Sequence, residues 1–205
     1  MNRAGRAESG GCESDVPGDA AIRVVLRREL AKQSANQPDT GVIDELGLCR
    51  GQVRIDLAVV NGLLHGYEIK SDRDRLDRLP SQVEVYSKVL DRATIVVGPR
   101  HLEEARRTVP GWWGVLRVAG TGADLRLVSA RRARDNPNQV PRALVELLWR
   151  EEALALLETR QADHGVRSKP RPAVWDRVCE AFDASEIATA VREGLKTRMD
   201  RPGTP

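Results

Sequence analysis

Three short runs rich in branched aliphatic residues follow one another at residues 42–48, 53–60 and 63–70, with only brief Gly-containing breaks between them. Runs of this length and composition, bounded by turn residues, are typical of β-strands. We therefore expect a meander of three strands, in which side chains alternate between the two faces of a sheet. This meander restricts the chain to folds that are built on a β-sheet.

Helical patterns and further strands flank the meander. Before it, apolar residues at positions 22, 25, 26 and 30 predict a helix that begins near Asp19. After it, Pro80 suits the first turn of a helix that runs to about residue 91, and residues 93–98 read as a fourth strand. A short helix over 101–108 and two strands over 113–119 and 125–128 complete the pattern. The order αβββαβ, then αββ, predicts an α/β (α+β) fold with a mixed sheet.

The C-terminal third has a different character. Regularly spaced leucines after Pro141 predict one long helix that reaches residue 157, followed by a linker over 161–172. Two closing helices are expected over 174–182 and 185–198, the last with a capping box of Asp183 and Glu186. We divide the chain into a flexible leader (1–18), a domain over 19–130 and a helical C-terminal extension (131–205).

Bulk composition narrows the class of protein. With 40% apolar and 31% charged residues, the chain reads as a globular protein, and it contains no apolar run long enough to cross a bilayer and no secretory signal. We expect a cytoplasmic protein with no membrane partner. The three cysteines and three histidines are scattered, so any metal should be held by oxygen atoms. The net charge of +3 suits an anionic partner but decides nothing alone.

Charged residues inside two of the strands are the informative feature. In the stretch RIDLAVVNGLLHGYEIKSD, Asp56 lies mid-strand, while Glu68 and Lys70 lie two residues apart on the next strand. Alternation puts Glu68 and Lys70 on one face. We place Ile55, Leu57 and Val59 together on the apolar face of their strand, which leaves Asp56 on the polar one.

The register of the two strands decides whether these charges meet. A two-residue turn at Asn61 and Gly62 would set Asp56 opposite Tyr67 and separate the carboxylates. A three-residue connection or a bulge instead pairs Asp56 with Glu68 and Leu57 with Tyr67. We predict the second register.

A third carboxylate, Glu45, faces away from Leu46 and Leu48 on its strand and can join this polar face. Carboxylates that converge repel one another unless a cation lies between them, and ligation by oxygen alone favours Mg²⁺ or Mn²⁺. A lysine beside such a site can orient the attacking water, so these residues suit phosphodiester hydrolysis.

The order Glu45, Asp56, Glu68-Ile69-Lys70 on successive strands resembles the PD-(D/E)XK nuclease superfamily, the restriction-endonuclease-like fold with an αβββαβ core. Gln82 and Tyr86, four residues apart on the following helix, are similar to the QxxxY element of the RecB-like nucleases. The segment EIKSDRDRLDRLPSQVEVY resembles small stand-alone bacterial members. The match covers about residues 20–98.

The resemblance implies a Mg²⁺-dependent deoxyribonuclease. By this resemblance, Asp56, Glu68 and the Ile69 carbonyl bind Mg²⁺, Lys70 assists the attacking water, and the products carry 5′-phosphates. Glu45 is the early acid and a further metal ligand, and Gln82 joins the catalytic residues. Some members place the early acid on the first helix, where Glu29 would substitute.

Basic residues outside this motif are candidate contacts to DNA. They are Arg73, Arg167, Lys169 and Arg171, to which we add Tyr86. The last three basic residues lie in a Pro- and Gly-containing stretch that could equally be a solvent-exposed loop without contact to DNA. The C-terminal helices could pack over the sheet, clamp DNA, or bind a second copy of the chain, as a homodimer, or an accessory protein.

Two other interpretations stay open. Asp56, Glu68 and Lys70 could be ordinary solvent-face residues of an exposed sheet that form a cross-strand ion pair. Alternatively, the chain could keep the nuclease fold as a catalytically silent DNA-binding or accessory module. Trp112 and Trp113 lead into an apolar strand, so we assign them to the core in preference to base stacking.

Overall fold

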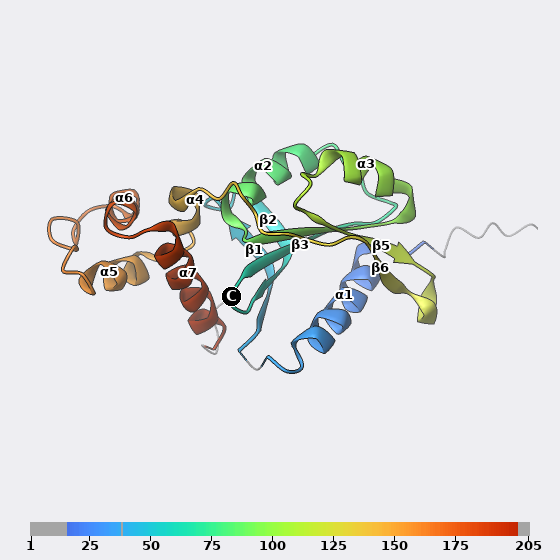
Figure 1. Cartoon of the computed structure of the whole chain (residues 1–205), viewed down its shortest axis with the longest axis horizontal. Coiled ribbons are helices and arrows are strands. Elements are labelled where there is room, and N and C mark those ends of the chain that lie inside the picture. The colour runs from blue at the N-terminus through green and yellow to red at the C-terminus, as the bar shows by residue number, and fades with distance from the viewer. Residues whose placement is uncertain (1–15, 38, 201–205) are drawn as a thin grey trace, which may run out of the picture.

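The computed structural model describes residues 16–37 and 39–200, and it is a mixed α/β fold. A sheet of six strands runs in the order β1-β2-β3-β4-β5-β6, with helices on both faces (Figure 1). Its strands are β1 (Gly41–Leu48), β2 (Val53–Val60), β3 (Leu64–Lys70), β4 (Arg92–Val97), β5 (Gly114–Ala119) and β6 (Arg126–Arg131). The helices are α1 (Asp19–Ser34), α2 (Leu79–Val89), α3 (Leu102–Thr108), α4 (Pro141–Val145), α5 (Arg150–Glu158), α6 (Arg171–Ala181) and α7 (Ala184–Met199). None of the helices over these residues has the length and apolarity needed to span a membrane.

The strand directions confirm the expected mixed sheet. β1, β2 and β3 form the antiparallel meander, whereas β3, β4 and β5 are parallel and β6 returns antiparallel to β5. The parallel pair β3 and β4 is joined through α2, as a parallel connection requires a crossover. The expected order αβββαβ, then αββ, is therefore confirmed to within a few residues at each boundary.

The predicted register is confirmed as far as Leu57 and Tyr67, where the ladder ends, so the expected pairing of Asp56 with Glu68 does not form. Val60 pairs with Leu64 and Leu57 pairs with Tyr67, so residues 61–63 form a three-residue connection. Gly62 adopts a φ of 104°, a conformation that glycine tolerates without strain. The register produced by a two-residue turn is thereby excluded.

Helices cover the sheet on both faces and divide the core in two. α1 lies against one face, where Ile22 and Leu26 pack with Leu57, Val59 and Ile69. α2, α3 and the C-terminal helices cover the opposite face (Figure 1). The expectation that Ile55 shares a face with Leu57 and Val59 is wrong, because Ile55 packs in the core layer under α2. The regular alternation of β2 side chains between the two faces of the sheet is therefore interrupted at Asp56.

The C-terminal region also departs from the pattern expected after Pro141. The prediction of a single long helix is wrong, because α4 ends at Val145 and α5 begins at Arg150. Between them, Trp149 has an extended backbone (ψ 158°). Glu152 stabilises this new start because its Oε2 accepts the Trp149 amide at 2.8 Å. The expected linker over 161–172 is partly structural, since Asp163 and Val166 within it are buried.

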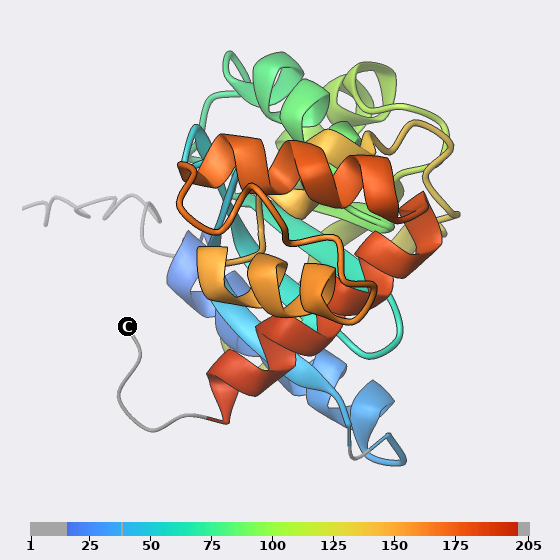
Figure 2. The ribbon, with the colours of Figure 1, turned by 90° about the vertical axis from the view of Figure 1, so that its left-hand side faces the viewer.

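The C-terminal helices belong to the same core as the sheet. α5, α6 and α7, coloured orange to red, lie together at one end of the molecule (Figure 2). Trp175 on α6 is 1% exposed, and its Nε1 donates to the Leu148 carbonyl at 3.2 Å. The capping box of α7 forms as predicted, with Asp183 and Glu186 each accepting the other's amide. Of the predicted leader, residues 1–15 lie outside the described part of the chain.

Asp91 ties the sheet to the C-terminal segment, which allows a test of this shared core. Its Oδ2 accepts the Leu64 amide at 2.6 Å and Arg192 Nη1 at 3.2 Å, and its Oδ1 accepts Gln139 Nε2 at 3.0 Å. Asp91→Ala should lower the free energy of unfolding by about 3 kcal/mol, because it leaves the amide of the buried Leu64 without its acceptor and the half-buried Arg192 without its carboxylate. Urea denaturation measures this.

The matched control is Asp135→Ala, which removes a side chain that is 78% exposed and paired with Arg92. It should cost less than about 1 kcal/mol. Equal losses in the two variants would contradict the linking role of Asp91.

Candidate active site

The site lies where β2 and β3 part. Their pairing runs from Val60 and Leu64 only as far as Leu57 and Tyr67. Beyond that point the Ile69 amide donates to the side chain of Asp56, whose Oδ2 lies 2.6 Å away. A carboxylate thus takes the place that a strand carbonyl would occupy. This substitution holds Asp56 at the opening between the two strands.

Glu68 and Lys70 form a buried pair on the floor of this opening. Glu68 is 2% exposed and Lys70 is 8% exposed, and Lys70 Nζ lies 2.6 Å from Glu68 Oε1. They share a face because alternate residues of a strand point the same way, as expected. Tyr67 and Ile69 point into the α1 side of the core instead.

Helix α2 completes the shell around Glu68. Gln82 Nε2 donates to Glu68 Oε1 at 2.7 Å, and the Tyr86 hydroxyl lies 2.7 Å from Glu68 Oε2 and 2.8 Å from the Arg54 carbonyl. Their spacing of four residues puts Gln82 and Tyr86 on one face of the helix. Tyr86 is therefore both a core residue and a partner of the site.

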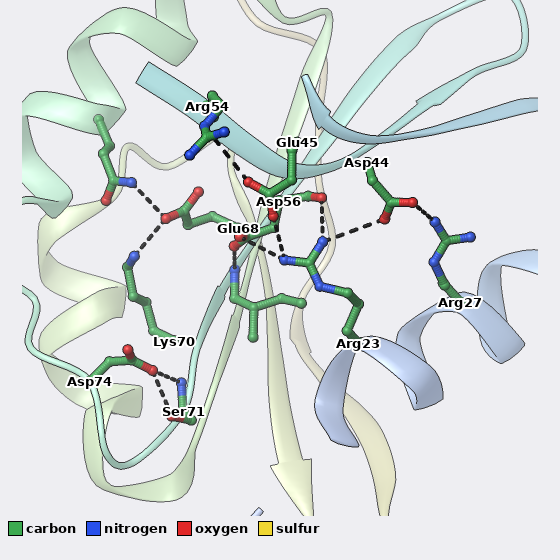
Figure 3. A network of polar contacts seen from close by, with 12 residues as sticks. Arg23, Arg27, Asp44, Glu45, Arg54, Asp56, Glu68, Lys70, Ser71 and Asp74 are labelled. Carbon is green, nitrogen blue, oxygen red and sulfur yellow. Dashed lines mark hydrogen bonds and ion pairs between the residues drawn. The ribbon is translucent and has the colours of Figure 1, made fainter. Parts of the chain in front are cut away.

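Asp56, Glu68, Lys70 and Gln82 line a cleft of about 480 Å³ (Figure 3). Arg54 at the start of β2 and Arg78 at the start of α2 also line it. The Arg54 side chain is 69% exposed, and Arg78 is exposed as well. The cleft thus combines acidic groups in its interior with basic groups that reach solvent.

Burial and neighbouring charge shift the pKa values of Asp56 and of Tyr86. Burial raises the pKa of Asp56 to about 6, and the charge of Glu68 adds to this rise, although the Ile69 amide, Arg23 and Lys70 oppose it. Burial, followed by the charge of Glu68, raises the pKa of Tyr86 far above its usual range. Tyr86 therefore stays a neutral hydrogen-bonding group.

Arg23 on α1 is a member of this site that the sequence pattern missed, as it missed the lining residues Asp19, Arg54, Asp74 and Arg78. Its Nη2 lies 2.8 Å from Glu45 Oε1 and 3.1 Å from Asp56 Oδ1, while its Nη1 donates to the Asp56 carbonyl at 2.8 Å (Figure 3). The only signal in the sequence is that Arg23 directly follows the buried Ile22. That position indicates that Arg23 lies at the edge of the buried face of α1, but it does not indicate which residues Arg23 contacts.

Glu45 lines the same cleft in an unusual backbone conformation. Its φ of 51° lies in the left-handed region, which costs a non-glycine residue about 1–2 kcal/mol. Leu46 and Leu48 share a face as expected, but Ile43, which should alternate with them, packs against the same core cluster. β1 therefore changes faces at Glu45, next to the change in β2 at Asp56.

The other predicted contacts lie away from the cleft. Arg73 donates to the Val16 carbonyl at 3.0 Å, and Arg167 pairs with Asp163 and Glu158. Arg171 lies over the Trp175 ring at 5.6 Å.

Neither Lys169 nor Glu29 lines the cleft, and Glu29 borders a different cavity beside α1. Trp112 and Trp113 are 7% and 0% exposed, which confirms their assignment to the core.

Magnesium is the ion that the resemblance implies. Among residues 16–37 and 39–200, no three Asp, Glu, His or Cys side chains are grouped to hold a metal. Asp56 and Glu68 offer carboxylates with Ile69 beside them, and Gln82 Oε1 is a buried acceptor without a donor in the described part of the chain. Mg²⁺ binds through one or two carboxylates and keeps several waters. This donor set fits a hydrated Mg²⁺ or Mn²⁺, not an all-protein cage.

Three comparisons with known proteins add a family to this geometry. The model of the family described as bacteriophage P4 protein cII matches residues 19–202. Protein cII of Enterobacteria phage P4 is 31% identical over 113 residues, which make up 55% of this chain and 42% of that relative. The match thus spans less than half the length of the curated relative. A protein of unknown function from Silicibacter pomeroyi aligns with a TM-score of 0.40 and 19% identity, over 71% of this chain and 96% of that one.

The raised pKa of Asp56 predicts a dependence of stability on pH. Its folded pKa of about 6 exceeds the ordinary value of 3.8, so the folded state holds this proton more tightly than the unfolded state. The resulting stabilisation is complete below about pH 4 and is lost as the pH rises through 6. Asp56→Asn lacks this loss. In EDTA, its free energy of unfolding should therefore rise relative to that of the wild type by about 2 kcal/mol as the pH increases from 4 to 8.

Urea unfolding of both proteins across this pH range measures the difference. Asp77→Asn, whose carboxylate is 68% exposed, controls for the removal of one negative charge elsewhere. A difference between Asp56→Asn and the wild type that stays constant with pH would show that Asp56 does not titrate in this way.

Proposed function

The chain belongs to the family of bacteriophage P4 protein cII, and for this member we propose the activity of a metal-dependent nuclease that hydrolyses phosphodiester bonds of DNA. The observation that carries the proposal is the buried Glu68–Lys70 pair, at 2.6 Å, on the floor of an open cleft that Asp56 also lines. Buried charge pairs add little net stability, and perturbed ionisable groups gather at functional sites. The arrangement therefore favours chemistry over a structural role.

The chemistry of the cleft favours phosphoryl transfer. Acidic ligands, a lysine and exposed arginines together suit a phosphodiester, which is an anion that must be neutralised before attack. When bound, Mg²⁺ or Mn²⁺ would offset charge on the phosphate and lower the pKa of a bound water. The resemblance to the PD-(D/E)XK superfamily supports the same assignment and predicts 5′-phosphate products.

The residues of the chain have separable roles in this proposal. The Ile69 amide and Arg23 orient Asp56, and Gln82 and Tyr86 fix Glu68 in one rotamer. Lys70 has three N–H donors, and one of them is directed at Glu68. The remaining donors can hold the attacking water in line with the scissile bond.

Lys70→Ala should reduce cleavage at least ~100-fold, because it removes the donor that orients the water. The assay uses labelled linear, circular, single-stranded and branched DNA with Mg²⁺ or Mn²⁺, and the substrates that are cut identify the preferred DNA structure. Lys88→Ala on the outer face of α2, where Lys88 pairs with Glu84, is the matched control and should cleave like the wild type. Circular dichroism checks that both variants fold.

Two results would oppose the assignment. Cleavage by Lys70→Ala at the wild-type rate in a clean preparation would remove Lys70 from the mechanism. Absence of cutting on every substrate, with DNA still bound by both proteins, would favour the silent DNA-binding or accessory module.

A further inference from the structure

Arg23 occupies the space between two acidic residues of the cleft. Its guanidinium lies 2.8 Å from Glu45 Oε1 and 3.1 Å from Asp56 Oδ1, and 3.4 Å from Asp44 Oδ1. Its other strong bond, at 2.8 Å, goes to the Asp56 main-chain carbonyl (Figure 3). One cation thus contacts both strands at the point where each changes faces.

The contacts require an arginine. A guanidinium presents several N–H donors in a fixed plane, so it can serve a carbonyl and two carboxylates at once, whereas an ammonium is a single point charge. The Arg23 side chain is only 26% exposed, and α1 holds its base because the neighbouring Ile22 is 1% exposed. The charge is therefore fixed in place and partly removed from water.

Glu45 also lies between two cations. Glu45 keeps its left-handed φ of 51° in mid-strand, and Arg54 Nε lies 4.0 Å from its Oε2. Backbone strain of this kind persists where the surrounding structure holds the residue in place, and it is concentrated at functional sites. Here two arginines face the carboxylate that the resemblance would assign to a metal.

We propose that Arg23 is an internal cation that takes the place of a second metal ion between Glu45 and Asp56, so that the cleft binds one divalent cation, at Asp56 and Glu68, and Glu45 is not a ligand. Like charges a few ångströms apart repel strongly where water is partly excluded. A dication between Glu45 and Asp56 would have to displace the guanidinium. Arg23 is thus a positioning residue, and this inference rests on the proposed metal-dependent function.

The test is Mn²⁺ binding to the full chain without DNA. Calorimetry and the electron paramagnetic resonance signal of free Mn²⁺ measure the binding. The wild type should bind one Mn²⁺ per chain. Glu45→Gln should bind one Mn²⁺ with an affinity within about twofold of the wild type, because the Glu45 carboxylate pairs with arginines and not with the metal. A loss of tenfold or more in Glu45→Gln would make Glu45 a ligand and overturn the inference.

Arg23 itself is tested by removing the internal cation. Arg23→Ala should bind a second Mn²⁺ per chain, and the double variant Arg23→Ala/Glu45→Gln should return to one. Arg27→Ala is the matched control, since Arg27 lies one turn further along α1 and pairs with Asp44, and it should keep one Mn²⁺. The Glu45→Gln measurement decides the matter even if Arg23→Ala does not fold.

The outcomes separate this inference from the proposed function. Two Mn²⁺ bound to the wild type, or one bound to a folded Arg23→Ala, would refute the role of Arg23 and leave the nuclease assignment standing. Absence of Mn²⁺ binding in the wild type, at millimolar concentrations, would contradict the metal site and the nuclease assignment together.

Discussion

The bond from the Ile69 amide to Asp56 Oδ2 is the constraint on which the rest of the site depends. Pairing of β2 with β3 ends at Leu57 and Tyr67, and an unpaired amide at that point would be costly in a protein interior. The carboxylate of Asp56 satisfies it, which lets the strands separate without losing that hydrogen bond. The opening that results is the cleft. A fully paired sheet would leave no room for it.

The separation of β2 from β3 brings the charges of β3 to the cleft. Hydrogen bonds from α2 stabilise the buried carboxylate there. Glu68 accepts bonds from Lys70, Gln82 and Tyr86, so no oxygen of this 2% exposed carboxylate lacks a donor. Hydrogen bonds of this kind make a buried carboxylate tolerable, although Gln82 Oε1, on the side chain that serves Glu68, is an acceptor without a donor in the described part of the chain. α2 must therefore hold Gln82 and Tyr86 against Glu68, and α4 packs against α2.

Much of this arrangement could be predicted, and the exceptions share a cause. Alternation and turn length were enough for the Leu57–Tyr67 register and for the common face of Glu68 and Lys70. Alternation failed at Glu45 and Asp56, because glutamate carries no propensity for a φ of 51° and only the assembled sheet forces it there. Arg23 was missed for the same reason: its partners are 22 and 33 residues away, and nothing local marks them.

Charge balance explains why the cleft needs these arginines. In the proposed nuclease, a DNA strand would bring one phosphate charge after another to a cleft lined by Asp56, Glu68 and the half-exposed Glu45. The chain's overall charge of +3 is too small to draw a polyanion against that local field, which depends on nearby groups. Fixed cations inside the cleft must therefore cancel the carboxylates, and exposed ones at its edge must receive the strand. Arg23 and Lys70 meet the first requirement, while Arg54, 69% exposed, is placed to meet the second.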